Sequence, residues 1–317
     1  MSADGPAVQA LGLGRSFGQN RAVDGVDLSI PAGTIFGLLG PDGAGKSTLF
    51  RMLATVLAPD TGDAMIFGKS VTSSPGQVTP RIGYMSQNFS MYPDLSVAEN
   101  LNFFATLRGI GRAARRRQSA QLMSAMGLAE FAARPAKNLS GGMKQKLMLA
   151  ATLMHQPDLL LLDEPTTGVD PVSRREFWRI LARLHRDGKT VLVATPYMDE
   201  AERCSDLAFL SSGRITRKGS PDDIKAVIPG TLFELATPLP RAALAALAGT
   251  PAVRSAHLYG DLVRVLWTGD DRGAEELTSR LLAAGVPVSA AKPARVDMEA
   301  AFAFLTQAER PGEVARR

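Results

Sequence analysis

The stretch Gly40-Pro41-Asp42-Gly43-Ala44-Gly45-Lys46-Ser47-Thr48 decides the fold of this 317-residue chain. It matches the pattern G-x-x-x-x-G-K-[ST], with an apolar strand pattern before it (34–40) and a helical pattern after it (46–57). Glycines let successive backbone N–H groups converge on phosphate oxygens, and a helix N-terminus adds its positive dipole end. The stretch therefore predicts a phosphate-binding loop between a strand and a helix.

Two side chains of this loop can bind a nucleotide directly. Lys46 can reach the β- and γ-phosphates, and the Ser47 hydroxyl can ligate Mg²⁺. A chance glycine-rich turn is the alternative, but the full spacing in a strand–helix setting disfavours it. By contrast, Gly12-Leu-Gly14 lacks the third glycine of a dinucleotide-binding fingerprint, so we expect no dinucleotide site there.

A second motif, Leu159-Leu-Leu-Leu-Asp163-Glu164-Pro165, places two acids at the end of an apolar run. Such a run is typical of a parallel strand covered on both faces, whose carboxyl end faces the ligand crevice of an open sheet. Asp163 would hold Mg²⁺ through its water shell, and Glu164 would polarise the attacking water as a general base. Alone, the two acids could equally be solvated; beside the phosphate-binding loop the functional interpretation is favoured.

The order of predicted elements indicates an α/β fold with a second, smaller domain. Near residue 225 the pattern changes to β-α-β-β-α-β, the order of a ferredoxin-like α+β unit. We therefore expect domains over 1–225 and 226–317, with a polar tail that frays after a final helix. In the first domain, strands are predicted within 8–30 (turn at 18–20) and over 190–194, and helices over 97–135, 140–155, 171–186 and 198–204. In the second domain, strands are predicted over 231–236, 252–259, 261–267 and 286–291, and helices over 239–248, 272–284 and 297–307.

Composition narrows the location of the chain. Its single cysteine, Cys204, excludes an internal disulfide framework, fits a reducing cytosol and is interpreted as a packing residue. No apolar run approaches the roughly 20 residues that span a bilayer, and residues 1–7 lack an apolar signal core. The net charge of +5 favours acidic partners (nucleotides, anionic lipid or nucleic acid) without choosing among them. We expect a cytosolic protein.

A third motif, Leu139-Ser140-Gly141-Gly142-Met143, precedes the acidic strand. On its own it predicts only an N-cap and the start of a helix. Together with the other two motifs, in this order, it resembles the signature sequence of ABC ATPases. The resemblance covers about residues 8–220. Within it, residues 37–46 and 197–202 look most like bacterial multidrug-export ATPases, and the tail segment 296–302 also resembles the end of those exporters.

This resemblance implies roles for further residues. Phe17 is similar to the aromatic residue that stacks on adenine, and Gln87 is similar to the loop glutamine that links the γ-phosphate and Mg²⁺ to a transmembrane partner. Gly168-Val-Asp170 is similar to the D-loop. ATP and Mg²⁺ are the implied ligands, with ATP lying between the phosphate-binding loop of one domain and Ser140–Gly142 of another.

The resemblance also implies partners. Separate transmembrane permease subunits would dock on a helical subdomain (about 88–155), mainly over 88–138, and a second ABC ATPase domain would complete a head-to-tail dimer. The chain would lie peripherally on the cytoplasmic face of the cell membrane. The basic run at 112–117 is interpreted as a solvated helix face rather than a lipid contact. Ribosomal members of the family usually carry two ATPase domains, and DNA-repair members insert a long coiled coil. Neither feature occurs in these 317 residues, so no nucleic-acid partner is expected.

One position departs from the family pattern. ABC ATPases carry a histidine after the strand that here is Val191–Ala194, whereas this chain has Pro196. Proline offers neither a side-chain donor nor a backbone N–H, and losing one preorganised contact to developing charge can cost roughly 10²–10³ in rate. We therefore expect an exporter ATPase whose own site is slow and which is paired with a different ATPase subunit. A homodimer that hydrolyses ATP without the histidine, a non-transport ABC ATPase and an ATP-dependent regulatory module are the alternatives.

Overall fold

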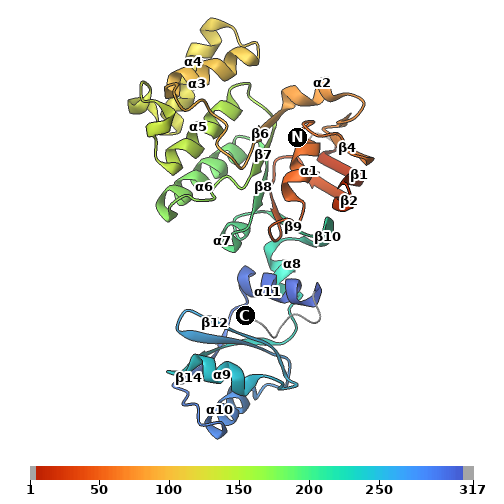
Figure 1. Cartoon of the computed structure of the whole chain (residues 1–317), viewed down its shortest axis with the longest axis vertical. Helices are drawn as coiled ribbons and strands as arrows, with labels where there is room; N and C mark the ends of the chain where they lie inside the picture. The colour runs from red at the N-terminus through yellow and green to blue at the C-terminus, as the bar shows by residue number, and fades with distance from the viewer. Residues whose placement is uncertain (1–4, 310–317) are drawn as a thin grey trace. The chain divides into compact units, whose positions relative to one another are not determined.

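The computed structural model describes residues 5–309 of the chain. The chain divides into two compact units, Met1–Ser220 and Pro221–Arg317 (Figure 1). The polar tail that the sequence predicts to fray after the last helix lies outside the described residues. Within the described range, every helix is too short or too polar to cross a bilayer.

A six-stranded sheet in the order β10-β9-β3-β8-β7-β6 forms the centre of the larger unit. All neighbouring strands run parallel except β10, which is antiparallel to β9. Every residue of β3, β7 and β8 is buried, as expected for strands covered on both faces. The predicted α/β core is confirmed. Its strands are β3 (Ile35–Leu39), β6 (Ile82–Met85), β7 (Leu159–Asp163), β8 (Thr190–Thr195), β9 (Asp206–Ser211) and β10 (Arg214–Gly219).

A four-stranded antiparallel sheet in the order β2-β1-β4-β5 completes the strands of this unit. The predicted turn at 18–20 joins β1 to β2, where Phe17 pairs with Asn20. Helix α1 (Lys46–Leu53) buries Leu49 and Phe50 in a core that residues of both sheets share. This packing fixes the start of α1 at the carboxyl end of β3. The strands of the second sheet are β1 (Pro6–Phe17), β2 (Asn20–Pro31), β4 (Thr61–Ile66) and β5 (Lys69–Ser70).

Helices α3, α4 and α5 contact one another and gather to one side of the larger unit (Figure 1). The region predicted to be helical over 97–135 contains two α-helices and a short 3-10 turn. Gly109, at φ 68°, ends α3 and Gly111 caps α4, while short 3-10 turns follow α4. Glycine tolerates this left-handed backbone, so the chain can turn between the two helices. The bounds are α3 (Val97–Leu107), α4 (Arg112–Ala125), α5 (Gly141–Leu153) and 3-10 turns at Ala129–Phe131 and Ala136–Asn138.

The remaining helices of the larger unit show two further corrections. Helix α1 ends at Leu53 rather than residue 57, because Thr55 takes a left-handed backbone at φ 59°. Helix α7 covers Met198–Ala201 rather than 198–204, and the Cys204 amide closes a turn onto the Ala201 carbonyl. The bounds of α6 (Pro171–Arg186) agree with the prediction. The remaining elements are the short helix α2 (Pro75–Val78) and a 3-10 turn at Thr79–Arg81.

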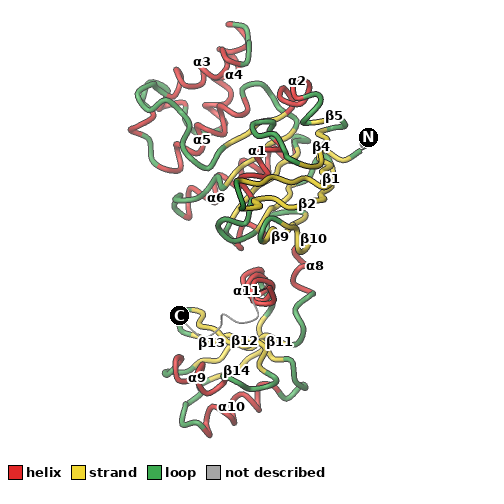
Figure 2. The backbone as a smooth tube through the Cα atoms, turned by 45° about the vertical axis from the view of Figure 1, so that its right-hand side comes forward, coloured by secondary structure: helices red, strands yellow, loops and turns green. Residues whose placement is uncertain are grey.

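The smaller unit has the β-α-β-β-α-β order predicted from the sequence, with its antiparallel strands in the order β12-β13-β11-β14. Helices α9 and α10 lie on one side of this sheet and α11 on the other (Figure 2). Arg264, buried in β13, bonds Glu234 of β11 and Asp297 beside α11, which fastens the last helix to the sheet. The elements are α8 (Pro221–Ala226), β11 (Thr231–Ala236), α9 (Pro240–Leu247), β12 (Val253–Tyr259), β13 (Leu262–Trp267), α10 (Gly273–Ala283), β14 (Ala290–Ala294) and α11 (Met298–Glu309).

The strand predicted over 286–291 is displaced: β14 begins at Ala290. Val286 is buried against the core of the smaller unit, but it belongs to a loop. Pro287 has no N–H to donate to a ladder, and the pairing with β11 begins only after it. Apolar alternation at Val286 and Val288 therefore reflects packing of a loop, not a strand.

Burial in β7 gives a direct test of the core. Leu161 is fully buried in β7, where it pairs with Tyr84 of β6 and Leu192 of β8. Leu161→Ala should therefore lower the free energy of unfolding by about 2–5 kcal/mol. Urea denaturation followed by circular dichroism measures this change. Leu11→Ala, at a position that is 60% exposed in β1, is the matched control and should change it by less than about 0.5 kcal/mol. Equal effects of the two variants would contradict this placement of the core.

Candidate functional site

The phosphate-binding loop lies between β3 and α1, as the sequence predicts. Gly45 caps α1 in a left-handed conformation (φ 105°), and no side chain caps the helix. A Cβ atom on Gly45 would lie 2.0 Å from the Ala22 carbonyl oxygen, and one on Gly40 would lie 2.1 Å from that of Leu210. Only glycine fits at these two positions. Because no side chain caps α1, its first backbone amides are left for an external acceptor, as in phosphate-binding helix termini.

Lys46 is almost completely buried at the first position of α1. Its Nζ donates to the carbonyl oxygens of Gly40 (2.9 Å) and Pro41 (3.1 Å), so the side chain folds back over its own loop. Its ammonium also lies 3.4 Å from Oε1 of Glu164. A buried ammonium needs such partners, because desolvating an unpaired charge is costly. A phosphate would compete with Glu164 for this cation.

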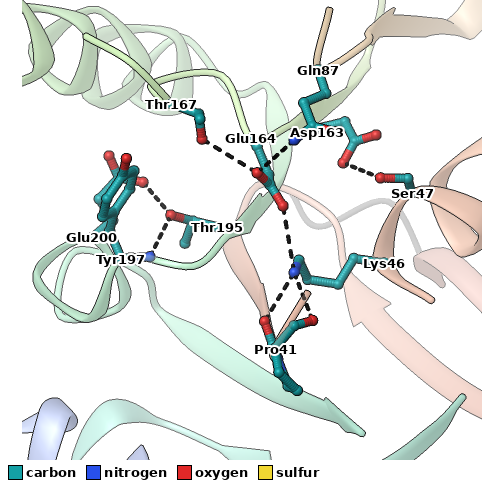
Figure 3. Close-up of polar contacts among 11 residues, drawn as sticks. Pro41, Lys46, Ser47, Gln87, Asp163, Glu164, Thr167, Thr195, Tyr197 and Glu200 are labelled. Carbon is teal, nitrogen blue, oxygen red and sulfur yellow. Dashed lines mark hydrogen bonds and ion pairs between the residues drawn. The ribbon is translucent and has the colours of Figure 1, made fainter. Parts of the chain in front are cut away.

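Ser47 and Asp163 meet across the same cleft. The Ser47 hydroxyl donates to Oδ1 of Asp163 at 3.0 Å, which joins the start of α1 to the end of β7 (Figure 3). Burial raises the pKa of Asp163 above its ordinary value, and the charge of Glu164 adds to this, whereas the hydrogen bond from Ser47 opposes it. A hydroxyl and a carboxylate are oxygen ligands of the kind that Mg²⁺ prefers.

Glu164 lies at the centre of the site (Figure 3). Its Oε2 accepts from Nε2 of Gln87 (3.0 Å) and from the Thr167 hydroxyl (3.3 Å), while Oε1 faces Lys46. The residue takes a left-handed backbone at φ 50°, a conformation that costs a non-glycine residue about 1–2 kcal/mol. Its amide donates to the Ala194 carbonyl of β8 (2.9 Å), which holds that backbone in place. In this conformation the carboxylate contacts Lys46 and Gln87.

The structure thus brings together five residues that the sequence singled out. The residues of the site fit ATP and Mg²⁺ on three grounds: two loop positions that admit only glycine, helix amides without a side-chain cap beside a buried lysine, and a serine facing a carboxylate. The five residues are Lys46, Ser47, Gln87, Asp163 and Glu164. Such a set can grip phosphates, ligate a hard cation and orient a water near a carboxylate. It defines a nucleotide-binding protein with a phosphate-binding loop.

Other predicted residues lie apart from this cluster. Phe17 ends β1 with its side chain 49% exposed, and the Arg15 guanidinium carbon lies 5.2 Å from the ring centre. An exposed ring of this kind is available for stacking. In the basic run, Arg115 bonds the Thr106 hydroxyl while Arg112, Arg116 and Arg117 are exposed, as expected of a solvated face.

The segments predicted to be the signature (140–142) and the D-loop (168–170) lie beside each other. Ser140 caps α5 by accepting from the Met143 amide, and Asp170 caps α6 by accepting from the amides of Val172 and Ser173. These bonds hold the pKa of Asp170 below its ordinary value. A Cβ atom on Gly142 would lie 2.5 Å from that of Ser173, so glycine permits the approach of α5 to α6. Within the described residues, no hydrogen bond or ion pair joins either segment to the Lys46 cluster of the same chain.

Pro196 follows β8 two residues after Ala194, the acceptor of the Glu164 amide. The segment around it is held by a buried network that sequence reasoning missed. Glu200, fully buried, accepts from the hydroxyls of Thr166 (2.5 Å) and Thr195 (2.6 Å). Threonines in turns carry no signal that names such a partner, so only the structure reveals it. Thr167, which bonds Glu164, was missed for the same reason.

Comparison with known proteins assigns the family. The model described as "ABC transporter" matches residues 23–167. The probable multidrug ABC transporter ATP-binding protein YbhF of Escherichia coli (strain K12) is 43% identical over 219 residues, which make up 69% of this chain and only 38% of YbhF. The daunorubicin/doxorubicin resistance ATP-binding protein DrrA of Streptomyces peucetius is 43% identical over 230 residues, 72% of this chain and 70% of DrrA.

Solved structures agree with these sequences. The structure of cbiO1 from Clostridium perfringens, part of the ABC transporter complex cbiONQ, has a TM-score of 0.65 at 25% identity and covers 71% of this chain and 92% of its own. A dimeric ATP-binding cassette in a post-hydrolysis state, bound to ADP and Pi, has a TM-score of 0.61 at 26% identity, covering 67% and 98%. The chain belongs to the ABC transporter family of ATP-binding proteins.

The lone cysteine provides a test of packing beside the site. Cys204 is buried and its thiol donates to the Glu200 carbonyl (3.6 Å); burial, with a smaller contribution from the charge of Glu200, raises its pKa to about 12. At pH 8 only about one thiol in ten thousand would then be ionised, and the thiolate is the reactive form. Ellman's reagent should therefore leave the native protein unlabelled and label it fully in urea. Fast labelling of the native protein would show that the cysteine is accessible.

Proposed function

We propose that this chain is the ATP-hydrolysing, energy-coupling subunit of an ABC exporter, and that its own ATP site turns over slowly. The observation that carries the proposal is the meeting of Lys46 with Glu164 (3.4 Å) and of Ser47 with Asp163 (3.0 Å) at the carboxyl ends of β3 and β7. These are the two halves of a hydrolytic site: phosphate and metal ligands on one side, and a carboxylate for water on the other.

The residues divide the chemistry among them. Amides of the loop and the Lys46 ammonium bind the β- and γ-phosphates of ATP, so Lys46 exchanges its contact with Glu164 for phosphate oxygens. Glu164, released from the lysine and still held by Gln87, is then free to accept a proton from the attacking water. When bound, Mg²⁺ would be held by Ser47, Asp163 and Gln87 and would neutralise charge on the transferred phosphoryl group.

Pro196 is the reason for proposing slow turnover. It follows the strand that anchors the Glu164 amide, yet it can donate no hydrogen bond to a phosphate. The signature Ser140–Gly142, which is intact, would complete the site of a second ABC ATPase domain. An asymmetric pair follows, with one slow and one competent site. Separate transmembrane permease subunits would use the helical subdomain, and the chain would lie on the cytoplasmic face of the cell membrane.

Export is proposed from the relatives. YbhF is described as a probable multidrug transporter component and DrrA as a drug-resistance protein, and both are 43% identical to this chain over the ATPase region. The second candidate function is an ATP-dependent regulatory module that binds ATP with little turnover. Pro196 is the observation that favours it.

Two substitutions separate these possibilities. In the assembled membrane complex, Glu164→Gln should leave most of the ATP hydrolysis in place, because the partner's site supplies it. Pro196→His should raise hydrolysis by restoring a donor, by up to about 10²-fold at this chain's own site. Steady-state phosphate release from the purified complex measures both rates.

The controls for this experiment use the same complex. A Glu164→Gln/Pro196→His double variant should lose the gain, because the added imidazole acts only with a working base. If Glu164→Gln abolishes all hydrolysis while Pro196→His changes nothing, the slow-site proposal is wrong and a symmetric enzyme remains. If no variant of the assembled complex hydrolyses ATP, the regulatory module is favoured.

A further inference from the structure

A cavity of about 160 Å³ lies between α6 and α7, outside the nucleotide cluster. It is several times larger than the share of liquid volume that one water occupies, about 30 Å³. A tetrahedral oxyanion of five heavy atoms therefore has room in it. Its lining residues are Pro171, Arg174, Arg175, Trp178, Asp199 and Arg203.

Positive charge dominates this cavity. Three of the lining residues are arginines and one is an acid. Arg175 and Arg203 are exposed at its rim, and neither forms an ion pair within residues 5–309. Asp199 lies 3.8 Å from Arg174, but its side chain is 63% exposed, and a pair of this kind contributes little because solvent screens it. An anion would meet a net positive surface of guanidinium groups, which match the oxygens of phosphate in bidentate geometry.

Two residues of the cavity lining carry a buried donor atom that has no hydrogen-bond partner among the described residues. The indole N–H of Trp178, a residue that is 3% exposed, has no hydrogen-bond partner among the described residues. Nε of Arg174 is also buried without one: its nearest carboxylate oxygen, on Glu200, is 3.9 Å away, too far for a hydrogen bond. Both atoms are shielded from the cavity, so the donors that an anion meets there are the guanidinium groups, of which those of Arg175 and Arg203 are exposed.

We propose that this cavity binds a small tetrahedral oxyanion of the phosphate class, held by the guanidinium groups of Arg174, Arg175 and Arg203. The donors are of the right type for oxygen acceptors, and they come from both walls of the cavity. This site is separate from the phosphate-binding loop, because none of its lining residues contacts Lys46 or Ser47 among the described contacts.

Binding there would stiffen the segment that carries Pro196. The Arg174 guanidinium carbon lies 4.0 Å from the ring centre of Tyr197, the residue after Pro196. An oxyanion that bridges Arg174 on α6 and Arg203 beyond α7 would tie this stack to the end of α7. The site would thus connect the concentration of an anion with the mobility of the degenerate histidine segment.

The indole N–H resonances test the proposal on the full-length chain. The protein has two tryptophans, so a ¹⁵N-labelled sample has one reporter in the cavity, Trp178, and one internal control, Trp267, whose N–H donates to the Asp270 carbonyl. Titration with inorganic phosphate should shift the Trp178 resonance saturably and leave that of Trp267 in place. Sodium chloride at matched ionic strength should shift neither.

Substitutions distinguish the cavity from the phosphate-binding loop. Arg175→Gln/Arg203→Gln should weaken the Trp178 response at least tenfold, since both arginines are exposed and the fold should survive. Arg183→Gln/Arg186→Gln, which removes two charges from exposed positions of α6 outside the cavity lining, should respond like wild type, and so should Lys46→Met. A Trp178 response that disappears in Lys46→Met, that persists in the double variant, or that sodium chloride reproduces would overturn the proposal, as would no response at all. None of these outcomes bears on ATP hydrolysis by the complex.

Discussion

The buried ammonium of Lys46 is the contact on which the rest of the site depends. It satisfies two loop carbonyls and the Glu164 carboxylate at once, in a place where water cannot screen the charge. Removing any one of these partners leaves a charge or a dipole unpaired. Because phosphate oxygens carry negative charge, as the Glu164 carboxylate does, a nucleotide can compete with that carboxylate for the ammonium. The same contact that stabilises the loop would therefore couple nucleotide binding to the freedom of Glu164, the proposed general base.

The parallel sheet makes this coupling possible. Parallel neighbours bring the carboxyl ends of β3, β7 and β8 to one edge, so the loop, the two acids and the Pro196 segment meet there although more than a hundred residues separate the first from the last. The amide of Glu164 bonds β8 directly. The strand that precedes Pro196 is thus joined to the backbone of Glu164. The predicted signature, Ser140–Gly142, lies against the predicted D-loop, Gly168–Asp170.

Much of this arrangement can be predicted from the sequence, for a physical reason. The glycines of the loop and the apolar run before Asp163 impose local backbone geometry, and strands buried on both faces then leave few ways to assemble the edge. Side chains that meet across long distances in sequence are different. Packing between loops determines the left-handed backbone of Glu164, its bond to Thr167 and the Glu200 network. Nothing in the local sequence pattern specifies this packing. The sequence pattern did not predict the turn at Gly109 or the loop position of Val286. The spacing of apolar residues alone cannot distinguish a continuous helix or strand from an interrupted one.

Equilibrium binding of ATP by Lys46→Met tests the central claim most directly. Losing a charge-assisted contact of about 1.5–3 kcal/mol should weaken ATP binding by roughly 10- to 150-fold, while a thermal melt should confirm that the variant is folded. Lys69→Met, at an exposed position in β5, is the matched control and should bind ATP like wild type. If the folded Lys46→Met protein binds ATP as tightly as wild type, the grip of this lysine on the phosphates is refuted and the account of the site with it.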